Sequence, residues 1–595
     1  MNERAIVIRA AVLVITFILI VRLFAIQVVT DDYKLAAENN FRREIIQYPY
    51  RGLMYDRKGA LITHNDPIYN LMVIPREVDL EDSTVVIDAL SLAPGDYTER
   101  YASARRFSRS KPSIFERQIS PTLFAQIQDE LSRLEGYYFE ARTYRAYDHN
   151  SFGNALGYVG EISGRALRRD TTNYYRQGDY VGISGIEQEY EQVLRGKRGV
   201  SIKMVNARGS VEGDFRGGEF DTVPVPGQDL QLTVDLELQR YAEVLMEGKV
   251  GSVVALDPST GEVLVFHSSP NYDPSLLSGR EFSDNFLQLQ RDTLKPLFNR
   301  PIQARYPPGS MFKTLQALIA MQEGVLGPTE QIYSDLTLIG DLAPAGYYDV
   351  IKAIQKSSNN YFYKVYRRVI MQGDHPNAFV DSRIGLEKWK AYCHQFGLGV
   401  PLGIDLPNEN SGNIPSVATY DKLYGANRWQ FSNFYSVSIG QGEVQVTPLQ
   451  MANLGAIMAN RGFFYTPHFV RQIGNDSLVN YERRIVGVDS SYFNVVVDGM
   501  EQVVAAGSGR RGFMRDIAIC GKTSTVENPP YPDHSGFMGF APKEDPQISI
   551  AVYVENAGQG GRAAASVASL LIEKYVRGEV TRPWLEEYVF RGEFF

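Results

Sequence analysis

The chain has 595 residues, too many for a single hydrophobic core, and this length predicts roughly three or four compact parts. Charged residues make up 22% and apolar residues 44% of the chain, which excludes a disordered chain and a multi-spanning membrane protein. A net charge of -8 without a long basic run gives no support to a nucleic-acid partner.

The two cysteines, Cys393 and Cys520, lie far apart in the sequence. Two such cysteines exclude a disulfide framework and a zinc cluster. We therefore expect both side chains to be buried free thiols.

An apolar segment near the N-terminus predicts a membrane anchor. The uncharged run 10–21 is shorter than the about 20 residues that a bilayer requires, but apolar character continues to residue 29 if Arg22 snorkels toward the interface. No small-residue cleavage site follows, so we favour an uncleaved anchor at 10–29 over a signal peptide. Basic residues before the anchor and acidic residues after it place residues 1–9 in the cytoplasm and the bulk of the chain outside.

Residues 30–227 predict an extended, β-rich pedestal without a catalytic cluster. A turn at Asp56 to Gly59 lies between two strand-like runs within 51–62, which is a hairpin signal. Helices are expected at 33–40, 82–92, 122–134 and 190–194. We interpret this region as a spacer and interaction platform.

Residues 228–595 predict an α+β domain. A strand at 229–234 leads to Asp235, which is suited to cap a helix that ends before Gly248. A long helical middle separates early β-rich runs from late ones, which predicts a five-stranded antiparallel sheet flanked by helices, the last of them at 563–575. The five runs are 251–256, 262–267, 517–525, 537–541 and 548–554.

The stretch Tyr306 to Thr314, with the sequence YPPGSMFKT, is the strongest candidate for chemistry. Its Pro-Pro-Gly turn leads into a run of helix formers, so Ser310 is expected at or near a helix N-terminus. Lys313 follows one turn later on the same face, within hydrogen-bond reach of the serine hydroxyl. A neutral lysine would take the serine proton, and the helix dipole would favour negative charge at the serine. The alternative is an ordinary capped helix with a surface lysine, because so short a motif also occurs by chance.

Two further segments would complete such a site. Ser357 and Asn359 precede a predicted helix, where a hydroxyl and an amide can contact a lysine and a substrate amide, although most such tripeptides are helix caps. Lys522 and Thr523 lie on a late strand, and a phosphate-binding loop is excluded there because the required glycine is replaced by Asp516. A lysine and a threonine on a strand edge suit a substrate carboxylate, and strand N–H groups suit an acyl oxygen.

The order Ser-x-x-Lys, Ser-x-Asn, Lys-Thr-x resembles the three-motif set of penicillin-binding proteins and serine β-lactamases. Residues 51–59 and 182–196 resemble the pedestal of class B penicillin-binding proteins. Their transpeptidase domain is resembled by residues 257–261, 269–274, 403–407, 438–442 and 447–450. The match spans nearly the whole chain and is strongest to the monofunctional transpeptidases of cell elongation.

The resemblance implies a D,D-transpeptidase anchored in the bacterial inner membrane, with its bulk in the periplasm and no cofactor. Ser310 would attack the D-Ala-D-Ala carbonyl of a peptidoglycan stem peptide, and an amine of a second stem would resolve the acyl-enzyme into a crosslink. Lys313 would be the general base, kept neutral by burial and by the nearby Lys522, and Ser357 would relay the proton. β-Lactams would acylate Ser310 by the same geometry.

The resemblance also implies how the substrate is held. Asn359 would bind its amide, and Lys522 with Thr523 would bind its terminal carboxylate, with Ser524 beside them. The backbone N–H groups of Ser310 and Thr525 would form the oxyanion hole.

Two departures from the family pattern affect these expectations. Ser524 stands where the third motif usually has glycine, so a side chain that points into the cleft would narrow the site, whereas one that points away would be harmless. The loop at 339–349 has no cysteine or histidine, unlike the metal-binding loop of some relatives, so we expect no zinc.

The resemblance implies two partners, a multi-spanning membrane glycosyltransferase and an elongation scaffold protein that binds the pedestal. Three alternatives stay open. A septal division transpeptidase would use the same chemistry with other partners. A β-lactam sensor or β-lactamase would bind β-lactams without making crosslinks, and a β-lactamase would release the acyl group rapidly. A catalytically inactive scaffold would not crosslink its substrate.

Overall fold

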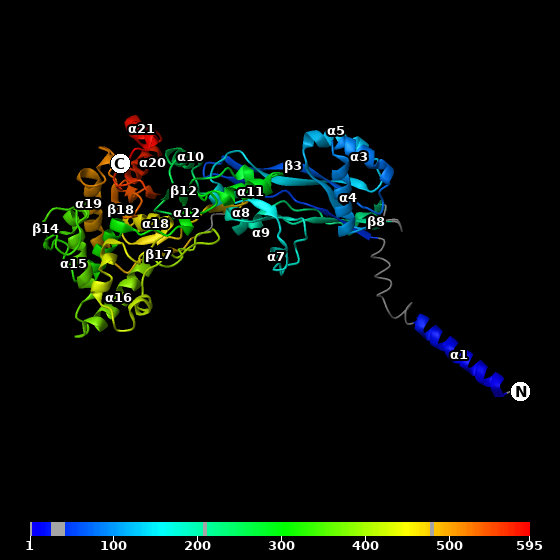
Figure 1. Ribbon diagram of the computed structural model, residues 1–595, viewed down its shortest axis with the longest axis horizontal. Coiled ribbons are helices and arrows are strands. Elements are labelled where there is room, and N and C mark those ends of the chain that lie inside the picture. Colours follow the sequence, from blue (N-terminus) through cyan, green and yellow to red (C-terminus); the bar gives the residue numbers. More distant parts are fainter. Residues whose placement is uncertain (1–2, 25–41, 206–210, 477–480, 595) are drawn as a thin grey trace. The chain divides into compact units, whose positions relative to one another are not determined.

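The computed structural model describes residues 3–24, 42–205, 211–476 and 481–594 (Figure 1). The chain divides into two compact units. The first comprises Met1–Gly52, Asn65–Tyr144 and Arg195–Gly227, and the second comprises Leu53–His64, Arg145–Leu194 and Gln228–Phe595. The helix predicted at 33–40 lies outside the described residues.

The N-terminal helix α1 (Glu3–Phe24) contains a segment, Ile6–Phe24, that is long and apolar enough to cross a membrane. Its side chains are exposed throughout this segment. The helix begins earlier than the predicted anchor at 10–29, because Ile6, Val7 and Ile8 extend the apolar run before Arg9 and an arginine does not break a helix. Residues 25–29 of the predicted anchor lie outside the described residues.

Besides α1, the described part of the first unit contains two antiparallel β-structures and the helices α3, α4 and α5. Strand β8 pairs with β1 on one side and β9 on the other. The end of β3 pairs with β4 and β5, and alternate side chains of these strands, such as Leu71, Val73 and Phe115, form a core with the helices. The elements are β1 (Arg42–Gln47), β3 (Leu61–Val73), η2 (Leu80–Asp82), α3 (Ser83–Ala89), α4 (Pro94–Phe107), β4 (Ser113–Ile119), α5 (Pro121–Leu131), β5 (Tyr137–Tyr147), β8 (Gly199–Val205), β9 (Val211–Asp214) and η3 (Phe215–Gly218).

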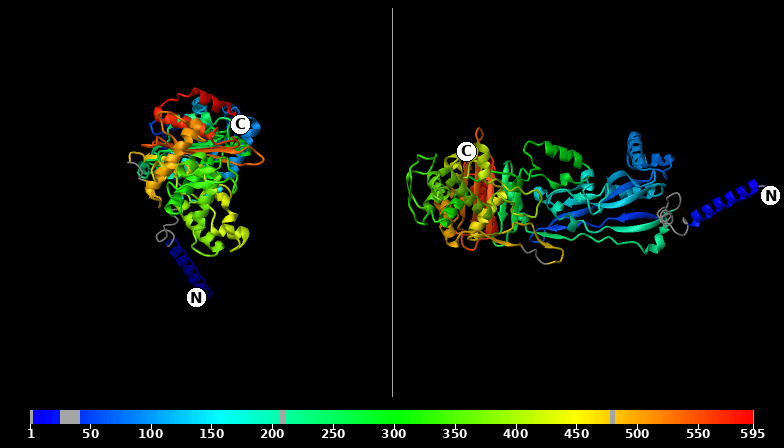
Figure 2. Two further views of the ribbon diagram at one scale, coloured as in Figure 1. Left: turned by 90° about the vertical axis from the view of Figure 1, so that its left-hand side faces the viewer. Right: turned by 90° about the horizontal axis from the view of Figure 1, so that it is seen from below.

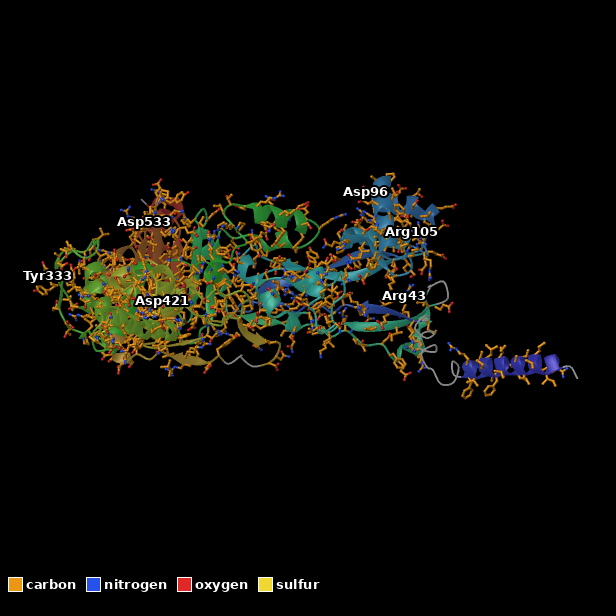
Figure 3. The ribbon with its side chains drawn as sticks, turned by 60° about the horizontal axis from the view of Figure 1, so that its bottom comes forward. Arg43, Asp96, Arg105, Tyr333, Asp421 and Asp533 are labelled. Atoms are coloured by element: carbon orange, nitrogen blue, oxygen red, sulfur yellow. The ribbon has the colours of Figure 1, made fainter. Side chains whose placement is uncertain are left out.

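The sequence predicted only part of this unit. The helices expected at 82–92 and 122–134 are confirmed by α3 and α5. Helix α4 and the long strands β3, β4 and β5 were not predicted, because their polar and apolar residues follow neither period cleanly. Arg43 on β1 and Asp96 and Arg105 on α4 are among the polar side chains that this unit carries (Figure 3).

In the second unit, the predicted hairpin is confirmed. The turn at Asp56 to Gly59 joins β2 to β3, and Gly59 takes the positive φ of 87° that the turn requires. Strand β10 lies between β2 and β16. The remaining short elements before residue 228 are β6 and β7, which pair with each other, and four helices of four or five residues. Their bounds are β2 (Met54–Tyr55), α6 (Gly153–Leu156), β6 (Val159–Glu161), α7 (Gly164–Leu167), β7 (Tyr180–Gly182), α8 (Gly185–Glu189) and α9 (Glu191–Leu194).

The predicted five-stranded antiparallel sheet is also confirmed, in the order β12-β11-β20-β19-β18. Neighbouring residues on each strand enter different cores: Val253 packs in one hydrophobic cluster and Val254 in the other. Helices α10, α20 and α21 contribute to the first cluster, α13 and α18 to the second, and helices flank both faces of the sheet (Figure 2). The strands are β10 (Leu230–Leu232), β11 (Gly251–Leu256), β12 (Val263–Ser269), β16 (Val470–Ile473), β18 (Cys520–Val526), β19 (His534–Ala541) and β20 (Ile548–Val554).

Helices form the middle of this unit. Asp235 caps α10 as predicted, with its side chain accepting from Leu238 N, and α20 confirms the final helix over the sheet. Helix α21 was not predicted from the aromatic and charged C-terminal sequence. The helices are α10 (Leu236–Leu245), α11 (Phe282–Arg291), α12 (Arg300–Gln303), α13 (Lys313–Gln322), α14 (Val350–Lys356), α15 (Asn359–Ile370), α16 (Ala378–Gln395), α17 (Val417–Tyr424), α18 (Pro448–Ala459), α19 (Ser490–Ala506), α20 (Ala564–Arg577) and α21 (Pro583–Arg591).

Short elements connect these helices. Two strand pairs, β13 with β14 and β15 with β17, lie in the connections. Their bounds, with the 3-10 turns, are η4 (Pro274–Leu277), η5 (Gly309–Phe312), β13 (Ile332–Ser334), β14 (Gly346–Tyr348), η6 (Phe431–Asn433), η7 (Tyr435–Ile439), β15 (Phe463–Tyr465), β17 (Arg483–Ile485) and η8 (Arg510–Gly512).

Candidate active site

Ser310 lies in the 3-10 turn η5 that runs directly into α13, close to the helix start that the sequence predicts. Gly309 holds a left-handed φ of 54° and donates from its backbone N to Gly440 O at 2.9 Å. A Cβ on Gly440 would stand 2.3 Å from Gly309 O, so only glycine allows this close approach of two backbones. The backbone of Gly440, directly after η7, therefore holds the turn that carries Ser310 in place.

A hydrogen-bonded chain links the predicted nucleophile to two lysines. The Ser310 and Ser357 hydroxyls are 3.0 Å apart, with Ser357 as the donor in this arrangement. Lys313 Nζ donates to Ser357 Oγ at 3.2 Å, and Lys522 Nζ donates to the same oxygen at 2.9 Å. The spacing of the first motif predicted direct reach from Lys313 to Ser310, whereas the family resemblance implied a relay through Ser357; in the described structure Ser357 Oγ bonds to both side chains.

Lys313 is completely buried, and its amine makes several hydrogen bonds. Its Nζ also donates to Ser357 O at 2.7 Å and to Asn359 Oδ1 at 2.6 Å. Burial lowers the pKa of Lys313 to about 7, and the negative charge of Asp341 acts in the opposite direction. A neutral amine in this position keeps one lone pair, and Ser357 Oγ is the hydroxyl oxygen within its reach.

Lys522 is also completely buried, and burial together with the positive charge of Lys313 lowers its pKa well below the usual value. We expected burial and the nearby Lys522 to keep Lys313 neutral. Burial is the cause that lowers the pKa of Lys313, and the charge that acts on it is that of Asp341.

Ser357 and Asn359 stand at the junction of two helices. Ser357 ends α14 in a left-handed conformation with φ 58° and ψ 38°, and the next residue, Ser358, caps α15 by accepting from Tyr361 N. The side chain of Asn359 accepts from Lys313 and donates through Nδ2 to Gly340 O at 2.6 Å. Because an amide group has two N–H donors, one remains for another acceptor.

Strand β18 is the edge strand of the sheet and carries the third predicted motif. The Thr523 and Ser508 hydroxyls form a short hydrogen bond. Thr525 is exposed, and its Oγ1 accepts from Gly560 N at 3.2 Å. As an edge strand, β18 presents backbone groups that no neighbouring strand satisfies.

The Ser524 side chain is buried and turned toward the serine turn. Its Oγ donates to Pro308 O at 2.8 Å, and it faces Gly309, where a Cβ would lie 2.1 Å from Ser524 Oγ. Gly536, its partner on β19, also lacks a side chain. The glycines at 309 and 536 thus make room for the serine that replaces the usual glycine.

The structure brings Ser310, Lys313, Ser357, Asn359 and Lys522 into one connected network, from three elements distant in the sequence. Thr523 is linked to this network by its carbonyl oxygen, which accepts from Lys522 Nζ at 3.2 Å. Ser524 is linked to the turn that carries Ser310 by its hydrogen bond to Pro308 O. Sequence reasoning missed Asp341 and Ser508. No local motif marks Ser508, and an aspartate followed two residues later by a backbone donor, as at Asp341, is a common turn signal.

Within residues 3–24, 42–205, 211–476 and 481–594, no group of three or more His, Cys, Asp and Glu side chains is arranged to hold a metal ion. Both cysteines are buried and free, as expected. The assembled groups support acyl transfer: a hydroxyl nucleophile, a proton path to an amine of lowered pKa, and polar groups along an edge strand.

Comparison with known proteins identifies relatives of both units. The family model described as the penicillin binding protein transpeptidase domain matches residues 251–573, and the model of the penicillin-binding protein dimerisation domain matches residues 46–232. The chain is 30% identical to "Peptidoglycan D,D-transpeptidase MrdA" of Haemophilus influenzae, over 98% of this chain and 93% of the relative. It is 29% identical to the protein of the same description from Escherichia coli K12, over 96% and 93%.

Solved structures agree in fold. The penicillin-binding protein PBP2 of Helicobacter pylori, in a complex with MreC, superposes with a TM-score of 0.75 at 24% identity, covering 91% of this chain and 99% of that chain. PBP2 of Pseudomonas aeruginosa, in a complex with WCK 5153, gives a TM-score of 0.66 at 26% identity with the same coverage. A chain of a peptidoglycan synthase complex, whose title concerns coordination of polymerisation and crosslinking, gives 0.70 at 25% identity over 98% of this chain and 100% of that chain.

Proposed function

Because this chain belongs to the penicillin-binding protein transpeptidase family, we propose that it is a serine-type peptidoglycan D,D-transpeptidase of cell elongation. Its substrates are stem peptides that end in D-Ala-D-Ala, and β-lactams acylate the same serine. The observation that carries this proposal is the hydrogen-bonded chain from Ser310 through Ser357 to Lys313. Lys522 of the third motif bonds to Ser357 in the same chain, so all three motifs meet there.

Acylation begins at Ser310. Its Oγ attacks the carbonyl carbon of the penultimate D-Ala while its proton passes to Ser357 Oγ, and Ser357 passes its own proton to the neutral amine of Lys313. The tetrahedral intermediate then collapses, and the C–N bond breaks as the proton passes from Lys313 through Ser357 to the amine of the departing D-Ala. The amine of a second stem next attacks the carbonyl carbon of the Ser310 ester. Its proton passes to Ser310 Oγ as the C–O bond breaks, so the serine is restored and the new amide is the crosslink.

The remaining site residues hold the substrate. The free N–H of Asn359 Nδ2 binds a substrate amide oxygen, and Lys522 with Thr523 binds the terminal carboxylate. That carboxylate brings a negative charge into the site, which favours protonated Lys522 when substrate is bound. The backbone N–H groups of Ser310 and Thr525 bind the oxyanion, since Ser310 lies in the first turn before α13, where N–H groups lack intrahelical partners. Ser524 belongs to the same strand, and its backbone faces the substrate while its side chain points toward Pro308.

Stable labelling by fluorescent penicillin tests this assignment. The wild-type chain takes up one label that persists, and Ser310→Ala takes up none, whereas the matched control Ser259→Ala, in the exposed β11–β12 turn, labels like wild type. Labelling of Ser310→Ala would refute the assignment. Rapid release of the label would instead support a β-lactamase, and stable labelling without crosslinking of purified lipid-linked substrate would support a β-lactam sensor or an inactive scaffold.

The proposal extends to place and partners. Helix α1, whose segment Ile6–Phe24 is long and apolar enough to cross a membrane, anchors the chain in the inner membrane with its N-terminal end in the cytoplasm. Residues 30–227 form the pedestal and 228–595 the periplasmic transpeptidase domain, and the two family matches support this division. A multi-spanning glycosyltransferase supplies the glycan strands, supported by the relative in a peptidoglycan synthase complex, and an elongation scaffold protein binds the pedestal. Depletion in the organism that carries the gene should produce round cells; filaments would indicate the septal division enzyme.

A further inference from the structure

The connection between β13 and β14, residues 335–345, reaches the start of α15 and contacts the second active-site motif. Asn359 Nδ2 donates to Gly340 O at 2.6 Å, and Asn360 Nδ2 donates to Ile339 O at 2.8 Å. In return Leu338 N donates to Asn360 Oδ1 at 3.1 Å. The side chains of two consecutive asparagines are thus attached to the backbone of this loop.

Asp341 lies at the centre of these contacts. Its Oδ2 accepts from Ser358 Oγ at 2.8 Å and from Asn360 N at 2.9 Å, and its Oδ1 accepts from Ala343 N at 3.0 Å. Both carboxylate oxygens are therefore in use, one toward the helix and one toward the loop. Because α15 is twelve residues long, its first-turn N–H groups and its dipole also favour a negative charge at this end.

Apolar packing holds the loop at Ala343, which is buried in the hydrophobic core, whereas its leucines are exposed. Leu342 is 99% exposed, and Leu336 and Leu338 are 44% and 41% exposed. Tyr333 and Tyr347, on the two flanking strands, contact each other in a tilted arrangement with their ring centroids 5.1 Å apart, and both are exposed; Tyr333 projects from the surface (Figure 3). Hydrogen bonds to Asp341, Gly340 and Ile339 attach the loop to the start of α15, and the ion pair of Asp335 with Lys364 attaches it further along the helix.

The residues that these bonds fix are the neighbours of the reacting groups. Ser357 sits in a left-handed conformation between two helices, and the backbone on either side of Asn359 is held through Ser358 and Asn360. Ser357 and Asn359 supply three acceptors to Lys313, so a shift of this junction displaces the proton path from Ser310.

We propose that Asp341 is a positioning residue for acylation: it clamps loop 335–345 to the start of α15 and so holds Ser357 and Asn359 in contact with Lys313. The inference rests on the proposed function, because it assigns a role at the same site. Asp341 itself need not touch the substrate.

The test measures penicillin acylation in the full-length protein, with the noncovalent binding constant separated from the acylation rate constant. Asp341→Ala should lower the acylation rate constant by about tenfold or more, because Ser357 and Asn359 move. The noncovalent binding constant should weaken by a smaller factor than the rate constant, because the contacts of β18 with the substrate stay in place and only the contact of Asn359 with the substrate amide is affected. Asp341→Asn, which keeps one acceptor oxygen and replaces the other by a donor, should fall between wild type and Asp341→Ala.

Asp335→Asn is the matched control. Asp335 lies on the same loop and also accepts from its own turn, at Thr337 N, but its side chain pairs with Lys364 and not with the Ser357 to Asn360 segment. It should acylate within about twofold of wild type. Partial unfolding lowers the fraction of molecules that label and leaves the rate constant of the rest unchanged, so the labelled fraction and thermal melting separate instability from mispositioning.

The outcomes are distinct. If Asp341→Ala, or Asp341→Asn where the alanine variant does not fold, acylates at the wild-type rate constant, or if Asp335→Asn is slowed equally, the clamp is overturned. If the wild-type chain itself does not acylate, or acylates at a residue other than Ser310, the proposed function fails instead.

Discussion

Lys313 joins the burial of the active site to its chemistry. The amine is completely buried, and burial lowers its pKa to about 7, whereas the charge of Asp341 raises it. The charge of Lys313 in turn lowers the pKa of Lys522. A base must be neutral to accept the proton from Ser357, so the acylation rate constant should rise with pH up to a pH near 7 and level off above it, falling about tenfold per pH unit on the acid side. Penicillin acylation measured from pH 5 to 9 checks this.

The charge of Asp341 gives that profile an internal control. Because its carboxylate raises the pKa of Lys313, Asp341→Asn should move the acid limb to lower pH, whereas Asp335→Asn should leave it in place. A rate constant that stays flat down to pH 5 would contradict the role of Lys313 as the base.

Ser524 provides a second prediction. Its hydroxyl donates to the buried Pro308 O, and loss of a donor to a buried carbonyl costs about 1 to 3 kcal/mol, so Ser524→Ala should lower the thermal midpoint. The side chain is buried against Pro308 and Gly309, so the noncovalent binding constant for penicillin should change by less than about twofold. Ser259→Ala, on an exposed turn, is the stability control. Tighter binding in Ser524→Ala would mean that the serine does narrow the site.

The junction of η7 with the serine turn is the element most sensitive to added volume. Gly440→Ala would place a Cβ 2.3 Å from Gly309 O and at a φ of 72°, so the turn that carries Ser310 must shift. We expect acylation to slow by about tenfold or more. Single-turnover labelling kinetics measure this directly.

Gly578→Ala is its matched control. Gly578 ends α20 at a similar φ of 85°, but a Cβ there meets nothing within 4 Å. It should cost about 1 to 2 kcal/mol of backbone strain and leave acylation unchanged. Equal loss of acylation in both variants would show that general destabilisation, not displacement of the serine turn, is the cause.

The elements that the sequence predicted are those with a clear local pattern. Strands β11 and β20 could be predicted because short β-branched runs lie between turn residues, and α10 because Asp235 caps an amphipathic segment. Helix α4 and strand β5 could not, since their charged residues hide the period and tertiary packing decides their state.

The same contrast holds in the active site. Ser310, Lys313 and Lys522 belong to short motifs that are visible in the sequence, and the order of the motifs identified the family. The carboxylate of Asp341 and the carbonyl of Pro308 act through bonds to residues 17 and 216 positions away, respectively, and no local pattern marks such pairs. The direction of the Ser524 side chain likewise depends on the absence of side chains at Gly309 and Gly536.

The division of the whole chain has a consequence for truncation. Arg145–Leu194 belongs to the same compact unit as the transpeptidase sheet, and its residues Phe152, Leu156 and Leu194 are buried in that unit's core. Phe152 N donates to Glu243, and Tyr190 Oη donates to Asp405 at 2.7 Å. A chain cut to 228–595 would therefore expose core side chains and leave two half-buried carboxylates without these donors.

We expect the 228–595 chain to melt more than about 10 °C below a chain that keeps 53–64 joined to 145–595 by a short Gly/Ser linker in place of 65–144. The linker is feasible because His64 Nδ1 lies 3.2 Å from Asp148 Oδ1, which places the two ends close together. The linked chain should also acylate at the wild-type rate constant, since the site lies wholly within its unit. Thermal melting and penicillin labelling of both chains test this. Equal stability of the two would mean that residues 145–194 pack on the transpeptidase fold without supporting it.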